Sequence, residues 1–287
     1  MTEERAAAVC RELLGVRAAA VGPIADSASW LQRVTLENGQ RVVVKIHSAR
    51  PGRAELERRA LTCLAAHSDV QAPMVLACGN VPGSDAEALV LVDVGPSNLG
   101  QLYCAGRCSR EEVLEAVGSL LARIHKLPLD CGPGDPHKSR PCVPVEALIA
   151  RCPDGVKQIA AAVVEQATKA ITQTRPTTWC HGDLHPANVV PMGQALDSAS
   201  LHVVDLEQVA CTIPEYDVAQ SLVTSDALDL SGRAAVLHGY ATRLDHELLT
   251  SLIAYQALRG WAYGAAVEGR DIALWTHRLT LAFQPFQ

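Results

Sequence analysis

The sequence is poor in aromatic residues and has no long apolar run. Aromatic side chains make up 4% of the 287 residues, and no stretch of 18 consecutive apolar residues occurs. A membrane-spanning helix needs about 20 such residues, and the segment from Met1 to Glu4 lacks the apolar run of a secretory signal. We therefore expect a cytoplasmic protein that has no membrane partner.

Closely spaced cysteine pairs are also missing, although the chain has ten cysteines. No Cys-x-x-Cys occurs, and Cys104 and Cys108 form one of the tightest pairs. Zinc and redox motifs need tighter spacing, and a reducing cytosol disfavours disulfides. We expect the cysteines to pack as small buried apolar residues.

The chain lacks a basic stretch as well. Its 25 Lys and Arg face 31 Asp and Glu, which gives a net charge of −6, and residues 94–287 carry most of the excess. Binding to a nucleic-acid backbone requires clustered positive charge, so we expect no nucleic-acid partner. The negative field favours a cationic small molecule as the ligand.

Residues 1–93 show the pattern of a small antiparallel sheet with flanking helices. A first helix ends near Gly15, and a loop rich in small residues follows. Asn38-Gly39 between two apolar runs is a hairpin signal. The predicted strands are Trp30–Leu36, Arg41–His47, Val75–Ala77 and Ala88–Val92, with a helix from about Ala54 to His67.

From Gly95 onward the pattern is mainly helical. Ser109 and Glu112 form a capping box that begins a helix, and the Pro- and Gly-rich residues 131–144 predict a loop. A helix over about 155–173 and short strands at Thr178–Cys180 and Leu201–Leu206 precede further helices. We expect two domains, residues 1–93 and 94–287.

The most informative segment runs from His181 to Asn188 with the sequence His-Gly-Asp-Leu-His-Pro-Ala-Asn, and Asp205 follows at a strand end. This spacing is typical of phosphoryl transfer. One carboxylate orients or deprotonates the attacking hydroxyl, while an amide oxygen and a second carboxylate hold magnesium on the phosphates. Magnesium prefers such oxygen ligands.

The histidines of this segment also have the i, i+4 spacing of a zinc pair. A zinc-binding His-Glu-x-x-His motif needs a glutamate at the second position and an unbroken helix. Gly182 occupies that position and Pro186 follows the second histidine. We therefore expect no zinc site there.

The segment resembles the catalytic loop of the aminoglycoside phosphotransferase and choline-kinase-like family, whose members share the protein-kinase-like fold. The resemblance implies an α+β bilobal protein with a small antiparallel-sheet N-lobe for nucleotide and a mainly helical C-lobe for catalysis and substrate. It implies that Asp183 is the catalytic base, that Asn188 and Asp205 bind magnesium, and that His181 and His185 support the loop.

Other segments resemble the family outside this loop. Lys45 matches its phosphate-binding lysine, with Glu57 as ion-pair partner and Glu55 as the alternative. Leu121 to His125 resembles the helix end before the substrate region. For the nucleotide, the resemblance implies phosphate contacts by Ser27 and Ser29, in a loop without glycine, and backbone contacts to adenine at Val92 and Val94. It also implies that Asp217 braces the catalytic loop and that Glu207 contacts the metal or a cationic substrate.

Together these features predict an ATP-dependent, or alternatively GTP-dependent, O-phosphotransferase with magnesium as cofactor. The resemblance implies an aminoglycoside or another amine-rich antibiotic as acceptor, and hence resistance or self-protection. A metabolic kinase for choline, a sugar or an amino alcohol is the alternative, although few aromatic residues are present to form a cage for quaternary ammonium. Trp261, Tyr263 and Trp275 could supply part of one. A non-catalytic nucleotide-binding protein is a further alternative.

Overall fold

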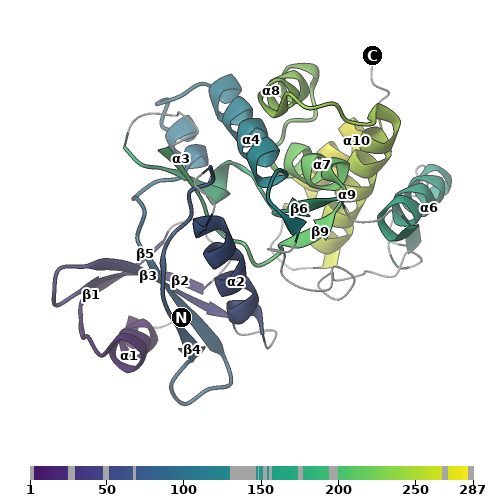
Figure 1. Ribbon diagram of the computed structural model, residues 1–287. Helices are drawn as coiled ribbons and strands as arrows, with labels where there is room; N and C mark the ends of the chain where they lie inside the picture. The colour runs from purple at the N-terminus through teal and green to yellow at the C-terminus, as the bar shows by residue number, and fades with distance from the viewer. Residues whose placement is uncertain are drawn as a thin grey trace. The chain divides into compact units, whose positions relative to one another are not determined.

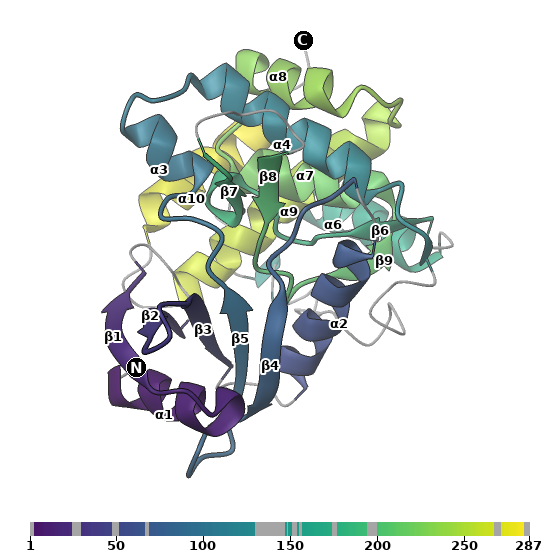
Figure 2. The same ribbon diagram turned by 60° about the vertical axis from the view of Figure 1, so that its left-hand side comes forward.

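The computed structural model describes residues 3–24, 30–47, 52–66, 69–129, 147, 149–150, 154, 157–173, 177–193, 200–266 and 271–283. The chain divides into two compact units, and Figure 1 and Figure 2 together label their strands and main helices. The first unit comprises Met1–Asn98, Val190–Ala195 and Ala199–Glu207, and the second comprises Leu99–Val189, Leu196–Ser198 and Gln208–Gln287. The fold is mixed, with an antiparallel sheet in the first unit and mostly helices in the second.

The first unit is built around a five-stranded sheet in the order β1-β2-β3-β5-β4, and every neighbouring pair is antiparallel. Gly39 adopts a φ of 84° in the turn between β2 and β3, a left-handed conformation that favours glycine. In the register, Lys45 lies between Leu31 and Leu89. The strands are β1 (Ala18–Pro23), β2 (Trp30–Leu36), β3 (Arg41–His47), β4 (Val75–Asn80) and β5 (Glu87–Val92).

Two helices cover opposite faces of this sheet, and both can be followed in Figure 2. Helix α1 (Glu3–Leu14) packs Val9 and Cys10 into a core with Val42, Val44 and other residues. Helix α2 (Arg53–Ala65) contributes a buried glutamate that contacts Lys45. Because side chains alternate along a strand, Lys45 faces away from the core formed by Val42 and Val44.

The strand β1 replaces the loop that the sequence predicts between Gly15 and Trp30. Ala18 to Pro23 contains small residues and a proline, so it has little intrinsic strand propensity. It pairs with β2 at the edge of the sheet, where proline is tolerated. Pairing with a neighbouring strand, which no local pattern reveals, therefore determines its conformation.

Residues 190–193 and 200–207 join the first unit although they are distant from it in sequence. Strand β7 (Val189–Pro191) pairs with β8 (Leu201–Val203). The backbone amide of Val203 donates to the carbonyl of Gln71 at 2.9 Å. The predicted strand Leu201–Leu206 thus ends at Val203, and the chain leaves the extended conformation before Asp205.

The second unit is mostly helical. Gly118 of α4 and Gly239 of α8 each lie where an added Cβ would collide with the backbone of the other helix, so the two helices pack at close range. Strands β6 (Thr178–Cys180) and β9 (Ala210–Thr212) form an antiparallel pair. The helices are α3 (Leu99–Cys104), α4 (Arg110–Ile124), α6 (Lys157–Gln173), η3 (Pro186–Asn188), α7 (Pro214–Thr224), α8 (Leu230–Tyr240), α9 (His246–Ala266) and α10 (Ile272–Ala282).

Several local predictions for this unit are confirmed. Ser109 and Glu112 form the expected capping box of α4. The helix predicted over 155–173 is α6, whereas α3, β7 and β9 were not expected. Residues 131–144 lie outside the described part of the chain. Among the helices that the structure describes, none combines the length and apolar character needed to cross a bilayer.

Candidate active site

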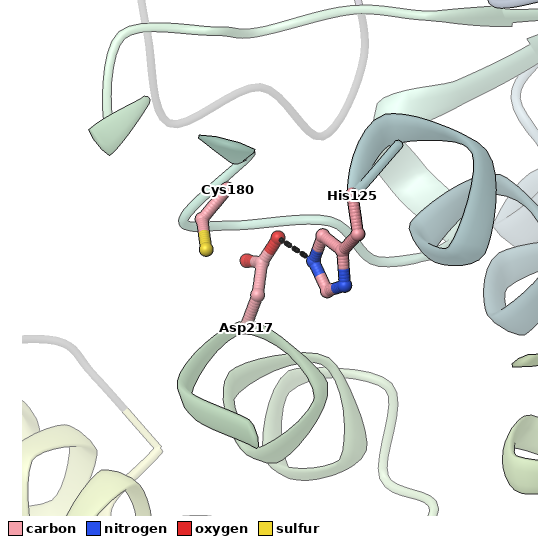
Figure 3. Close-up of side chains that lie close together, drawn as sticks. All are labelled: His125, Cys180 and Asp217. Carbon is pink, nitrogen blue, oxygen red and sulfur yellow. Dashed lines mark hydrogen bonds and ion pairs between the residues drawn. The ribbon is translucent and has the colours of Figure 1, made fainter. Parts of the chain in front are cut away.

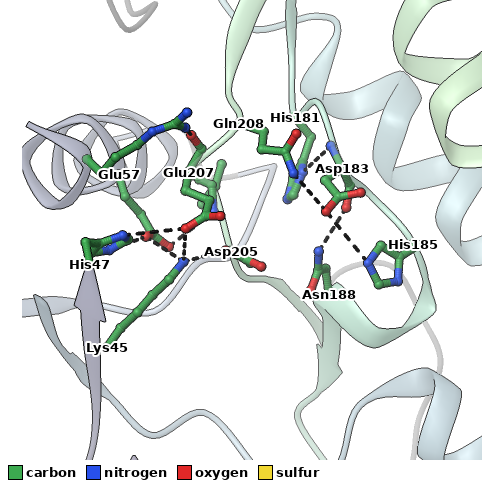
Figure 4. Close-up of polar contacts among 12 residues, drawn as sticks. Lys45, His47, Glu57, His181, Asp183, His185, Asn188, Asp205, Glu207 and Gln208 are labelled. Carbon is green, nitrogen blue, oxygen red and sulfur yellow. Dashed lines mark hydrogen bonds and ion pairs between the residues drawn. The ribbon is translucent and has the colours of Figure 1, made fainter. Parts of the chain in front are cut away.

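Lys45 is the centre of a buried charge cluster in the first unit (Figure 4). Its side chain is 2% exposed, and its Nζ lies 2.8 Å from Glu57 Oε2 and 3.4 Å from Glu207 Oε2. Nζ also donates to Asp205 Oδ1. The expected partner Glu57 is thus present, whereas Glu55 pairs with Arg58 and Arg59 at the surface.

The charges of this cluster stabilise one another. Burial alone disfavours the ammonium, but attraction to the three carboxylates outweighs it and raises the pKa of Lys45. Burial likewise disfavours the Glu57 carboxylate, but attraction to Lys45 and close contact with the His47 ring lower the pKa of Glu57 to about 2. Both groups are therefore charged at neutral pH.

His47 joins the cluster from the same face of β3, two residues beyond Lys45. Its Nε2 lies 3.2 Å from Glu57 Oε2, and its Nδ1 lies 3.5 Å from Glu207 Oε2. The other Glu57 oxygen accepts from the backbone amide of Leu206 at 3.2 Å. His47 was not among the residues expected in the site, although its i+2 spacing from Lys45 places both on one face of the strand.

Asp205 occupies an unusual backbone conformation after β8. Its φ is 65°, a left-handed value that aspartate and asparagine adopt more readily than most residues. Arg53 donates to the carbonyl of Glu207, and this contact holds the far end of the same segment. The Asp205 side chain remains 26% exposed, so its carboxylate can receive a ligand.

Asp183 lies in a loop of the second unit, after β6 (Figure 4). Its side chain is 21% exposed, and Oδ2 accepts from Gln208 Nε2 at 3.2 Å. Asn188 Nδ2 donates to the Asp183 carbonyl at 2.9 Å, which leaves the amide oxygen as the Asn188 atom able to coordinate a cation. His185 Nε2 lies 4.0 Å from Asp183 Oδ2, and His181 Nδ1 accepts from the Asp183 amide at 3.2 Å.

Asp217 holds this loop from the first turn of α7. Its two carboxylate oxygens accept from the backbone amides of His181 and Gly182, each at 2.8 Å. His125, at the end of α4, contacts Asp217 Oδ2 through Nε2 at 3.1 Å (Figure 3). Burial disfavours the carboxylate, but these hydrogen bonds and nearby histidines lower the pKa of Asp217. Gly182 has a φ of 81°, and a Cβ there would collide with the carbonyl of Gln208.

Figure 3 also shows Cys180 beside His125 and Asp217, a grouping of residue types that can bind metal ions. Asp217 already accepts from two backbone amides, and the Cys180 thiol donates to the carbonyl of Ile213 at 3.7 Å. These contacts account for the residues as a structural brace of the loop.

Arg259 of α9 is a second residue that the sequence analysis missed. Its Nη1 donates to Tyr216 Oη and to Gln256 Oε1, each at 2.7 Å. The contact with Tyr216 raises the pKa of Arg259, and Asp183 adds a smaller effect in the same direction, whereas burial acts in the opposite direction. The direct contacts of Arg259 are thus with Tyr216 and Gln256, and the charge of Asp183 is the smallest of these influences. No local motif marks Arg259, because helix packing brings it near this loop.

The residues expected to contact the nucleotide have different outcomes. Val92 ends β5 and Val94 follows it, and both are half-buried. Ser27 and Ser29 lie outside the described residues. The contacts of Val92 and Val94 with adenine and of Ser27 and Ser29 with phosphate therefore all stay predictions.

Comparisons with known proteins identify a family whose model matches this chain and solved structures that share its fold. A model described as the phosphotransferase enzyme family matches residues 24–261. The structure is similar to a thermostable mutant of the aminoglycoside phosphotransferase APH(4)-Ia, with a TM-score of 0.67, 15% identity and coverage of 98% of both chains. It is similar to the GDP and kanamycin complex of APH(2'')-IIia, with a TM-score of 0.70, 14% identity and coverage of 98% of this chain and 97% of the other.

A third similar structure is the choline kinase LicA from Streptococcus pneumoniae, with a TM-score of 0.64, 16% identity and coverage of 92% of each chain. A search of curated proteins finds no match. The fold is thus common to proteins whose names indicate different acceptors.

Proposed function

Since the chain belongs to the phosphotransferase enzyme family, we propose that it transfers the γ-phosphate of ATP to a hydroxyl group of a small molecule. The observation that carries this proposal is the buried Lys45, which contacts Glu57 and Asp205. A lysine is rarely buried without a functional or structural partner. Here the cluster combines a cation for phosphate oxygens with a partly exposed carboxylate for a metal ion.

In the proposed reaction, the acceptor hydroxyl oxygen bonds to the γ-phosphorus while the bond from that phosphorus to the ADP oxygen breaks. Asp183 accepts the hydroxyl proton, and Gln208 orients its carboxylate through the bond to Oδ2. Lys45 neutralises charge on the phosphates, and Glu57 keeps the ammonium in place. Catalysis then depends mainly on positioning and electrostatic stabilisation.

Asp205 and Asn188 each offer an oxygen of the type that magnesium prefers. The Asp205 carboxylate is partly exposed, and the hydrogen bond from Asn188 Nδ2 turns its amide oxygen away from the Asp183 carbonyl. This donor chemistry fits magnesium, and we assign both residues as its ligands. When bound, magnesium neutralises phosphate charge and helps to orient the γ-phosphate.

We propose an aminoglycoside or another amine-rich antibiotic as the acceptor, modified in the cytoplasm as resistance or self-protection. The family, the net charge of −6 and the acidic excess of residues 94–287 support a cationic acceptor. ATP is the proposed donor and GTP the alternative; a similar structure was solved with GDP.

A choline, sugar or amino alcohol kinase is the alternative function. For choline, one candidate cage residue is already engaged, because the Arg278 guanidinium lies 4.9 Å from the centroid of the Trp275 ring. A cage for quaternary ammonium needs open aromatic faces, so the occupied face of Trp275 favours an acceptor with primary amines.

The proposal is tested by measuring phosphate transfer from ATP or GTP, with magnesium, to aminoglycosides, macrolides, choline, sugars and amino alcohols. We expect transfer to at least one amine-rich antibiotic, and Asp183→Ala should lower the rate by about 10²–10⁴-fold while nucleotide binding persists. Asp205→Asn should fold and lose magnesium-dependent transfer. Nucleotide binding without transfer to any compound would instead identify a non-catalytic binding protein.

A further inference from the structure

Asp93, the first residue after β5, carries a buried carboxylate that pairs with two arginines of the first unit. Its side chain is 1% exposed, and Oδ2 lies 2.9 Å from Arg33 Nε and 2.6 Å from Arg41 Nη2. The arginines come from the neighbouring strands β2 and β3. Removing one partner from a buried charged group is strongly unfavourable, so both strands hold the chain at Asp93.

Arg33 also holds the chain two residues further on. Its Nη2 donates to the carbonyl of Gly95 at 2.7 Å, while the Gly95 amide lies 3.3 Å from Asp93 Oδ1. The planar guanidinium uses two of its fixed donors at once, one for the Asp93 side chain and one for the Gly95 backbone. Arg33 thus fixes the residues on both sides of Val94.

The backbone groups around Val94 are mostly satisfied within the unit. The amide of Val92 donates to Met74 at 2.9 Å, and the amide of Asp93 donates to Arg41 at 3.2 Å. The amide and carbonyl of Val94 find no partner among the residues that the structure describes. Val94 therefore keeps one donor and one acceptor that can pair with a planar heterocycle.

The arginine pair and Lys45 belong to the same face of the sheet. Arg33 pairs with Val43 across β2 and β3, and paired residues point to the same face. Lys45 lies two residues beyond Val43 and shares that face. A ligand whose phosphates contact Lys45 can therefore extend along this face toward Val94.

We propose that Arg33 and Arg41 are positioning residues for the nucleotide base, acting through Asp93 to present the Val94 backbone; this rests on the proposed nucleotide-binding function. Neither arginine needs to contact the base. Because their ion pairs fix the segment in advance, binding loses less conformational entropy, which strengthens recognition of the base. The phosphate contacts at Lys45 do not depend on this arrangement.

The test compares two ligands, ATP and inorganic tripolyphosphate, by titration calorimetry of the full chain with magnesium present. Arg33→Lys keeps the charge and loses the forked geometry. Arg58→Lys is the matched control, because Arg58 makes a similar two-donor contact with Glu55 on the surface of α2. Asp93→Asn is a second variant that keeps size and removes the charge, and its thermal midpoint reports on folding.

We expect Arg33→Lys to weaken ATP binding by about tenfold and to change tripolyphosphate binding by less than about twofold. Arg58→Lys should leave the binding of both ligands unchanged. Unchanged ATP affinity in Arg33→Lys, or an equal loss for both ligands, overturns the inference while the proposed function stands. A wild-type chain that binds no ATP overturns both. A folded Asp93→Asn protein with wild-type ATP affinity also contradicts the role of Asp93.

Discussion

In the first unit, opposite charges hold Lys45, whereas in the second unit hydrogen bonds from backbone amides to Asp217 hold the Asp183 loop. The Lys45 contacts are ion pairs in which one ammonium serves three carboxylates. The Asp217 contacts use two amides whose positions the backbone fixes. The ammonium of the first arrangement can exchange carboxylate partners for the phosphates of the proposed nucleotide, while the second arrangement is set by folding alone.

Replacing Lys45 by methionine should have the largest effect on this comparison. The change leaves the buried Glu57 without its ammonium partner, so we expect a loss of about 3–5 kcal/mol in the free energy of unfolding and loss of phosphate transfer. Urea denaturation followed by circular dichroism measures the stability. Lys169→Met, at an exposed position of α6, is the control and should stay within about 0.5 kcal/mol. Equal effects of the two changes would contradict the charge-based account.

Replacing Asp217 by alanine tests the loop of the second unit. The amides of His181 and Gly182 lose their acceptor in a buried environment, so we expect a loss of about 2–4 kcal/mol in stability and a lower kcat. Asp229→Ala removes the N-cap of α8 and an ion pair with Arg110 at the surface, and it should cost about 1–2 kcal/mol. If Asp217→Ala costs no more than this control, the amide contacts are not what holds the loop.

Lowering the pH should destabilise the Lys45 cluster by a smaller amount than the two replacements above. The pKa of Glu57 falls from 4.5 to about 2 in the folded chain. The stability from this group is present above pH 4.5 and is lost as the pH falls toward 2, because the unfolded chain binds the proton first. Between pH 7 and pH 4 this group accounts for a loss of about 1 kcal/mol. Urea titrations at pH 7 and pH 4 measure the difference in unfolding free energy between wild type and Glu57→Gln, and this difference should be smaller at pH 4. An equal difference at the two pH values would show that Glu57 does not cause the loss of stability in acid.

Local sequence signals were sufficient to predict the strand that carries Lys45 and the loop that carries Asp183. Asn38-Gly39 and the apolar runs on either side of it give β2 and β3 with the same bounds in sequence and structure. The segment from His181 to Asn188 identifies the loop because its spacing is itself the signal. In both cases the information lies within a few neighbouring residues.

Long-range contacts could not be predicted in this way. β1 has no strand pattern and is a strand because β2 pairs with it. Arg33 and Asp93 are separated by 60 residues, and no spacing rule connects them. Gln208 likewise contacts Asp183 from 25 residues away in the sequence. The resemblance implied Glu57 as the partner of Lys45 and left Glu55 as the alternative, and the fold shows that Glu57 contacts Lys45 whereas Glu55 pairs with Arg59.

The left-handed backbone at Asp205 limits which residues can replace it. Asparagine and glycine tolerate this conformation, while most other residues would strain it by about 1–2 kcal/mol. Because one nucleotide change converts an aspartate codon to an asparagine codon, a gene for this chain is one mutation from a product that folds and lacks this carboxylate. If Asp205 holds magnesium as proposed, the residue at this position is a better guide among related genes to whether the product is active than an intact fold is.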